Sequence, residues 1–171
     1  MIKRKIDVWD YVGDSVHAMR PGILLTTKVS EKVNSMVIGW GTLGIEWENP
    51  IYVAYVRTGR FTHKMVKSNG EFTINWPVGD FPCKVLVFFG SKCGRDRNKI
   101  AESGVTLVEP NVISVPGIKE FLLTLECSML YSQKQEDSKI GGEIKRHFYK
   151  METADHVAYY AEIVDAYSIE E

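Results

Sequence analysis

The chain has 171 residues, of which 44% are hydrophobic and 25% are charged, a composition typical of a globular protein. Its net charge of −1 excludes a general electrostatic attraction to nucleic acid or to an anionic membrane, so any binding of phosphate has to be local. The cationic N-terminus is not followed by a continuous apolar run, which predicts neither a signal peptide nor a membrane span. We expect one cytoplasmic domain over residues 1–171, with no nucleic-acid or membrane partner.

Most segments, taken in chain order, have the alternation of apolar and polar residues that is typical of strands. The pattern predicts strands over residues 23–29, 35–42, 51–56, 71–76, 121–132, 143–151 and 157–167. Fewer segments are predicted to be helical: one begins at Thr62, and two others cover residues 84–89 and 95–103. Residues 133–142 form the one long polar connection, with two glycines at its expected turn. Many strands and few helices predict a mainly β protein, built as an antiparallel barrel or closed sandwich.

The turn over residues 57–63 leaves a predicted strand and opens a short helix. Its guanidinium and hydroxyl groups can converge with backbone N–H groups on one anion, because the first amides of a helix lack partners within the helix. Thr62 is predicted to be the N-cap, and Phe61 and Val66 occupy the two positions of a hydrophobic staple. The sequence therefore predicts a phosphate site here. The alternative is that these residues serve stability alone, since such caps are common.

A second cationic turn covers residues 93–99, where Gly94 is followed by two arginines and Lys99. Asp96 is the expected N-cap of the helix that follows, and it would order the neighbouring cations. This turn is a second candidate for an anion site. The alternative is a solvated basic face of a helix.

Neither a metal site nor a dinucleotide-binding fold is expected. The three cysteines and four histidines show no spacing typical of metal ligands. Residues 39–44 match the pattern G-x-G-x-x-G, but Asn49 and Pro50 follow too soon for the helix that this fingerprint requires. The glycines are better explained by a bulge in a strand or by the close approach of a ligand.

Several short motifs occur in an order that resembles one known family. They cover residues 21–27, 34–36, 49–50, 60–63, 70–75 and 93–99, followed by Glu126, Asp155-His156 and residues 162–164. In this order they resemble the flavin reductase-like, FMN-binding split-barrel family, and within it the flavoredoxin-like branch.

The resemblance implies a homodimer of antiparallel, six-stranded split β-barrels with a few peripheral helices, each of which binds FMN near the dimer interface. It implies that the flavin phosphate lies at Arg60 and Thr62, and that the flavin ring lies along residues 34–36. The full set of cofactor-binding residues that it implies is Thr26, Thr27, Asn34, Ser35, Met36, Trp40, Arg60, Thr62, His63, Cys93 and Lys99.

Some of these residues have alternative explanations in the sequence. Asn34 and Ser35 could form a turn between strands, and Met36 and Trp40 could fill the core. The chain also departs from the family pattern at Val37 and Cys93, where the family often has hydroxyl groups. Binding of flavin is expected to survive both changes, because Arg60 and Lys99 would supply the neutralising charge.

The resemblance implies an oxidoreductase whose redox chemistry belongs to the flavin, with no catalytic acid or base required of the protein. We expect an NAD(P)H-dependent flavin or ferric reductase, in which NADH or NADPH gives a hydride to FMN and the electrons pass to an acceptor. Two alternatives stay open: a flavoredoxin-type electron carrier reduced by a partner enzyme, and a non-enzymatic split barrel that binds haem or a metabolite.

Overall fold

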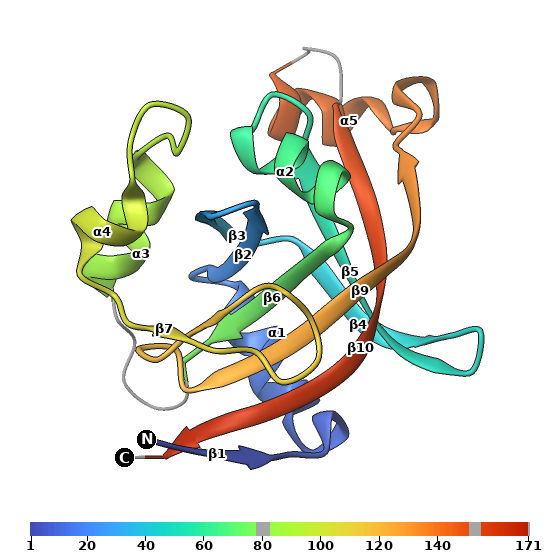
Figure 1. Cartoon of the computed structure of the whole chain (residues 1–171). Coiled ribbons are helices and arrows are strands. Elements are labelled where there is room, and N and C mark those ends of the chain that lie inside the picture. Colours follow the sequence, from blue (N-terminus) through green and yellow to red (C-terminus); the bar gives the residue numbers. More distant parts are fainter. Residues whose placement is uncertain (78–82, 151–154, 171) are drawn as a thin grey trace.

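The computed structural model describes residues 1–77, 83–150 and 155–170, and its main feature is one antiparallel sheet curled into an open barrel (Figure 1). The strand order is β3-β2-β6-β9-β10-β5-β4, and β1 pairs with β10 outside this path. The strands are β1 (Ile2–Lys5), β2 (Ile23–Val29), β3 (Lys32–Ile38), β4 (Gly41–Glu46), β5 (Asn49–Arg57), β6 (Glu71–Trp76), β9 (Leu123–Lys134) and β10 (His156–Glu170). A separate pair is formed by β7 (Leu107–Val108) and β8 (Gly117–Ile118). The end strands β3 and β4 do not pair with each other in this order, so the barrel stays split.

The barrel is held together by apolar side chains that point inward from most of its strands. The largest of them include Trp76, Tyr52, Phe72 and Tyr159, which are almost completely buried. The long strand β10 pairs with β1, β5 and β9, and its register against β9 shifts at two places. Such irregularities increase the local twist and bend of a strand, which allows one sheet to wrap around a single core.

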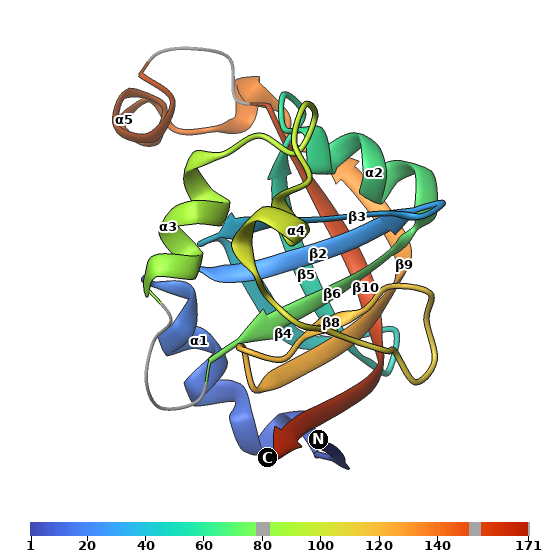
Figure 2. The ribbon, with the colours of Figure 1, turned by 60° about the vertical axis from the view of Figure 1, so that its left-hand side comes forward.

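Helices cover the outside and the ends of the barrel. They are η1 (Val8–Tyr11), α1 (Val12–Met19), α2 (Phe61–Asn69), α3 (Cys83–Ser91), α4 (Lys99–Ser103), η2 (Asp137–Lys139), α5 (Gly142–Ile144) and η3 (Lys145–Tyr149). Helices α3 and α4 lie together beside β2 and β3 (Figure 2), where Leu86 and Phe89 pack with Leu24 in a second apolar cluster. Helix α5 lies at the same end of the barrel as α2 (Figures 1 and 2).

The mainly β, antiparallel split barrel predicted from the sequence is confirmed, with two corrections to its strands. The strand predicted over residues 35–42 is divided, because β3 ends at Ile38 and β4 begins at Gly41. The strand predicted over residues 143–151 is wrong: it is helical as far as Tyr149, Lys150 ends the helix in a turn, and residue 151 lies outside the described residues. Ile144 and Phe148 are four residues apart, so the same apolar pattern also fits one face of a helix. The sheet gains β1 and a separate β4, giving eight strands where six were expected.

Candidate functional site

The start of α2 offers backbone donors that no side chain caps. Arg60 is the N-cap, and its side chain makes no capping hydrogen bond. The predicted N-cap, Thr62, is wrong: it is the second helical residue, and its Oγ1 accepts a hydrogen bond from Nδ2 of Asn34 at 2.8 Å. The side-chain oxygen is therefore used by β3. The His63 N–H donates to the carbonyl oxygen of Arg60 at 3.1 Å, and the amides before it are the ones open to a ligand.

A loop before α4 reaches the same place from the other side. Gly94 lies so close to Asn34 that a Cβ atom at this position would overlap Oδ1 of the asparagine. Asn34 is only 2% exposed, and it connects β3 to α2 through Thr62 and to this loop through Gly94. The predicted cap Asp96 is wrong, because Asn98 caps α4 by accepting from the backbone N–H of Ala101 at 3.2 Å.

Lys99, the first residue of α4, is a buried cation with few partners. Lys99 is only 3% exposed, and its Nζ donates to the carbonyl oxygen of Phe89 at 3.2 Å. Burial is the main cause that lowers the pKa of Lys99 to about 8; Cys93 opposes this effect, and the positive charge of Arg60 adds to it. A buried ammonium group beside a second cation is stabilised by a bound anion.

These segments enclose a hollow, which we call the cationic hollow. Among the described residues that line it, three are basic, namely Arg60, Lys92 and Lys99, and none is acidic. The other lining residues are Met36, Val37, Gly59, Phe61, Thr62, Phe89, Gly90, Ser91, Cys93 and Gly94. An excess of positive charge with no carboxylate in the lining is the chemistry of an anion site.

A second hollow continues the first and shares Met36, Val37 and Arg60 with it. We call it the aromatic hollow; its further lining residues are Ile38, Gly39, Trp40, Tyr55, Arg57 and His156. The rings of Trp40 and His156 are 4.7 Å apart between centroids and tilted by 34°, so they form one wall. A third, more apolar hollow shares Gly39, Trp40 and Tyr55 and adds Val16, Met19, Arg20, Gly41 and Gln135. The three hollows adjoin through these shared residues, and we call them together the groove, with a cationic end and an aromatic end.

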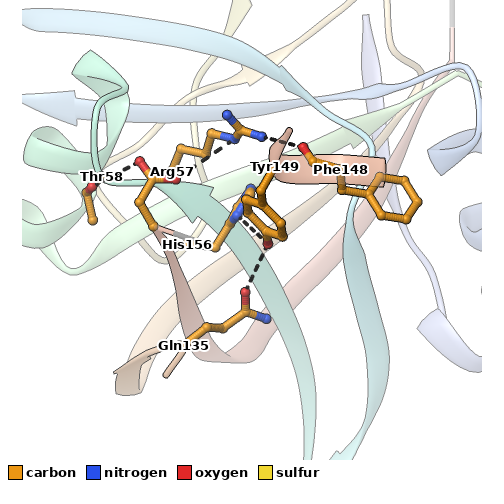
Figure 3. Close-up of polar contacts among 7 residues, drawn as sticks. Arg57, Thr58, Gln135, Phe148, Tyr149 and His156 are labelled. Atoms are coloured by element: carbon orange, nitrogen blue, oxygen red, sulfur yellow. Dashed lines mark hydrogen bonds and ion pairs between the residues drawn. The ribbon is translucent and has the colours of Figure 1, made fainter. Parts of the chain in front are cut away.

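The segment that carries η3 is fastened beside the aromatic hollow by polar contacts (Figure 3). Arg57 donates from Nη2 to the carbonyl oxygen of Phe148 at 3.2 Å and forms a long ion pair with Asp155 at 4.0 Å. The hydroxyl of Tyr149 is 3.0 Å from Nδ1 of His156. Phe148 also packs edge-on against Trp40, at 5.5 Å between ring centroids. The lining of the aromatic hollow thus comes from β3, the β3–β4 connection, β5 and β10, and η3 packs against Trp40 and His156 of that lining.

The sequence-predicted residues fall into two groups in the structure. Met36, Arg60, Thr62, Cys93 and Lys99 line the cationic hollow, and Trp40 lines the aromatic hollow. The others point elsewhere and hydrogen-bond inside the protein: Thr26 to Ser35 at 2.7 Å, Thr27 to the carbonyl oxygen of Glu71 at 3.0 Å, Asn34 to Thr62, and His63 to the hydroxyl of Tyr159 at 2.7 Å. Contact of this second group with a ligand stays a prediction.

The residues that the sequence did not predict include Arg57, Lys92 and His156, which line the hollows, and Tyr149, which contacts His156. Two of them carried a signal in the sequence: His156 belongs to the Asp155-His156 motif of the family order, and Arg57 begins the predicted phosphate turn. Lys92 and Tyr149 carried no such signal, because only the fold brings Lys92 to the cationic hollow and Tyr149 against His156.

In the parts of the chain that the structure describes, no three His, Cys, Asp or Glu side chains are grouped so that they could hold a metal ion. The helices described there include none with the length and apolar character needed to cross a membrane.

Comparisons with known proteins agree with this architecture. A family model for the flavin reductase like domain matches residues 17–171. An uncharacterized protein of Archaeoglobus fulgidus is 27% identical over 134 residues, which cover 78% of this chain and 64% of that protein. One of Pyrococcus abyssi is 28% identical over 130 residues, or 75% of this chain and 73% of that protein. The first match therefore spans less than two thirds of its relative's length.

Among solved structures, a flavoredoxin of Methanosarcina acetivorans has a TM-score of 0.68 and 25% identity, covering 88% of this chain and 69% of that one. A putative flavin reductase with a split barrel domain from Shewanella frigidimarina has a TM-score of 0.70 and 15% identity, covering 97% of this chain and 76% of that one. At the latter identity the likeness concerns the fold alone. Because the family model spans residues 17–171, this chain belongs to the family of flavin reductase like domains.

Proposed function

We propose that the groove binds FMN, with the phosphate in the cationic hollow. The observation that carries this proposal is the lining of that hollow, in which Arg60, Lys92 and the buried Lys99 have no acidic companion among the described residues. A phosphate monoester brings close to two negative charges, and charge-assisted hydrogen bonds to it are among the stronger polar contacts in proteins. The uncapped first turn of α2 supplies additional N–H donors and a favourable dipole.

The next part of the groove fits a flat ring that is partly apolar and partly polar. Met36 and Val37 join the two hollows, and Trp40 and His156 provide planar surface beyond them. β3 is an end strand of the sheet, so part of its backbone N–H and C=O groups is not used by a neighbouring strand. These backbone groups can meet the polar edge of an isoalloxazine ring, which accounts for a role of residues 34–36 even though the Asn34 and Ser35 side chains are engaged inside.

We further propose an oxidoreductase that takes electrons from NADH or NADPH and passes them to an acceptor. Bound FMN would supply the hydride and electron chemistry. The residues of this chain would neutralise the phosphate through Arg60 and Lys99, orient the ring along β3, and exclude water with the η3 segment. Relatives described as flavoredoxins support a redox role and also keep open the alternative of an electron carrier.

Charge reversal at Arg60 tests the phosphate assignment. Arg60→Glu replaces a neutralising partner by a repulsive one at an exposed turn, so the folded protein is expected to lose bound FMN, measured by absorption after gel filtration. Lys64→Glu is the matched control, because Lys64 is exposed on the same helix and does not line the hollow. If Arg60→Glu keeps stoichiometric flavin, the assignment is wrong.

Anaerobic mixing of the FMN-loaded protein with NADH or NADPH separates a reductase from a carrier. Bleaching of the flavin band by a nicotinamide supports the reductase. Bleaching by dithionite alone supports the carrier. A protein that takes up no FMN on reconstitution would point to the third possibility, a barrel that binds haem or another metabolite.

We also propose that the chain forms a homodimer through an exposed apolar patch on the outside of the barrel. The patch includes Ile45, Trp47, Leu130 and Tyr131, all of which are exposed. Ring contacts join Trp47 to Tyr131 at 6.4 Å and Tyr131 to Tyr160 at 5.4 Å between centroids, so the aromatic part of the patch is continuous. Contiguous exposed apolar surface of this kind is typical of protein interfaces.

A further inference from the structure

The third hollow of the groove, which we call the apolar hollow, combines apolar and aromatic surface with a single charged residue. Its volume is about 430 Å³, within the range of about 300–1,000 Å³ that is common for ligand pockets. Among the described residues that line it, one is basic, namely Arg20, and none is acidic. The lining consists of Val16, Met19, Arg20, Gly39, Trp40, Gly41, Tyr55 and Gln135.

Trp40 supplies a flat apolar surface to this hollow. Its ring contacts those of His156 and Phe148, at 4.7 Å and 5.5 Å between centroids, and these contacts hold the indole in place. The residue nevertheless stays 40% exposed, and Val16, which lines the same hollow, is 50% exposed. Apolar and aromatic side chains that are exposed together in a concave site are typical of a ligand site, and a flat indole favours an aromatic ligand.

Arg20 is the cation of the apolar hollow, and it has no counter-ion of its own. It is the C-cap of α1, where its backbone N–H donates to the carbonyl oxygen of His17 at 3.3 Å. Its guanidinium forms neither an ion pair nor a hydrogen bond with any residue in the described ranges. A guanidinium presents a planar set of N–H donors that matches a carboxylate, so this group is open to an anionic ligand.

Gln135 adds a second donor to the lining. The Tyr149 hydroxyl donates to its Oε1 at 3.5 Å, and its backbone N–H donates to the carbonyl oxygen of His156 at 2.9 Å (Figure 3). Because Oε1 faces Tyr149, the Nε2 amide group is the part of the Gln135 side chain that is left for a ligand. The donors of Arg20 and Gln135 and the lack of a carboxylate in the described lining favour a ligand whose polar group is an acceptor.

We propose that the apolar hollow binds a planar aromatic carboxylate, with its ring against Trp40 and its carboxylate at Arg20. A neutral aromatic compound would bury the same ring and leave the guanidinium without an acceptor, so the charge sets the preference. The apolar hollow shares Gly39, Trp40 and Tyr55 with the aromatic hollow. A role of the bound acid as the electron acceptor rests on the proposed function; its binding does not.

A comparison of 2-naphthoate with 2-naphthamide, which has the same rings and no charge, tests the site in the whole chain. Isothermal titration at pH 7 should give naphthoate an affinity at least about tenfold higher, the effect expected of one charge-assisted hydrogen bond. Arg20→Met should abolish this preference. Arg95→Met is the matched control, because it removes an exposed arginine that lines none of the three hollows, and it should keep the preference. Equal affinities for the two probes in the unsubstituted protein, or an unchanged preference in Arg20→Met, overturn the proposal.

Val16→Glu provides a second test that leaves the guanidinium in the chain. It places a carboxylate four residues before Arg20, one helical turn away, where it pairs with the guanidinium. Val16 lines the apolar hollow and neither of the other two, so this variant should lose the preference for naphthoate and keep the FMN affinity of the unsubstituted protein. A preference that survives this substitution overturns the proposal.

FMN titrations of the same proteins separate this site from the proposed function. Preferential binding of naphthoate by a protein that takes up no FMN would support the carboxylate site and overturn the proposed function. Uptake of FMN without a preference for naphthoate would overturn the carboxylate site alone.

Discussion

Lys99 is a buried ammonium group, and its burial links the protonation of the site to stability. Its pKa is lowered from 10.5 to about 8 in the folded protein. Between these values the unfolded chain binds more protons than the folded one, so the free energy of unfolding of the ligand-free protein should rise as the pH rises from 8 to 10.5. A bound phosphate favours the charged lysine and offsets the cost of its burial below pH 8.

The rise in melting temperature that FMN produces should therefore be larger at pH 7 than at pH 9, where Lys99 is mostly neutral. Thermal unfolding with and without saturating FMN at both pH values measures this difference. Lys99→Met keeps the length of the buried chain and should abolish the difference. Equal stabilisation at the two pH values in the unsubstituted protein would contradict an anion bound at Lys99.

At the scale of elements, the site depends on the junction of β3, α2 and the loop before α4. Gly94→Ala places a methyl group where Asn34 lies, so the loop or the asparagine has to move and the hydrogen bond to Thr62 is strained. A lost buried hydrogen bond is worth about 1–3 kcal/mol, so we expect FMN affinity to fall by about 5- to 150-fold, measured by fluorescence titration. Gly44→Ala is the control, because nothing lies within 4 Å of a Cβ atom there. The same affinity in both variants would refute the role of this junction.

Glu126 of strand β9 holds the loop that follows β7 through hydrogen bonds. This fully buried carboxylate accepts backbone N–H groups of Asn111, Val112 and Ile113 at 2.6, 2.8 and 3.0 Å. Glu126→Gln turns one acceptor oxygen into a donor that faces other donors, and should lower the free energy of unfolding by about 1.5–3 kcal/mol in urea titrations. The exposed Glu143→Gln serves as the reference. A change no larger than that of the reference would mean that the clamp adds nothing to stability.

The sequence predicted a helix or strand correctly where the local residue pattern agrees with the packing of that segment in the fold. Leu123 and Leu125 alternate with polar residues and lie in β9, within the strand predicted over residues 121–132. The sequence misassigned residues 143–149, because Ile144 and Phe148 fit both a strand and one helical face.

The sequence predicted the charged residues of the candidate site, but not which segments of the chain meet there. Arg60 and Lys99 could be named from two cationic turns, yet nothing local shows that both turns face one hollow. Thr62 was assigned as a cap because threonine commonly caps helices, whereas its actual partner, Asn34, is 28 residues away in the chain. Contacts of this range are set by the curl of the sheet, which no short motif encodes.

At the scale of the whole molecule, the exposed patch around Trp47 and Tyr131 predicts a dimer. Tyr131→Glu buries a charge in that interface, so light scattering should report a mass near 19.4 kDa in place of twice that value. Val87→Glu, an equally drastic change at an exposed apolar residue of α3, should stay dimeric. A dimer that survives Tyr131→Glu would place the interface elsewhere.

The proposed function depends on the binding of a phosphate in the cationic hollow, and a comparison of FMN with riboflavin tests this binding. The two ligands share the flavin ring and differ in the phosphate. Fluorescence titration should give FMN an affinity at least about 100-fold higher, since two charge-assisted contacts, from Arg60 and Lys99, would be lost with riboflavin. Equal affinities for the two ligands would show that the cationic hollow does not bind the phosphate, whatever ring the groove accepts.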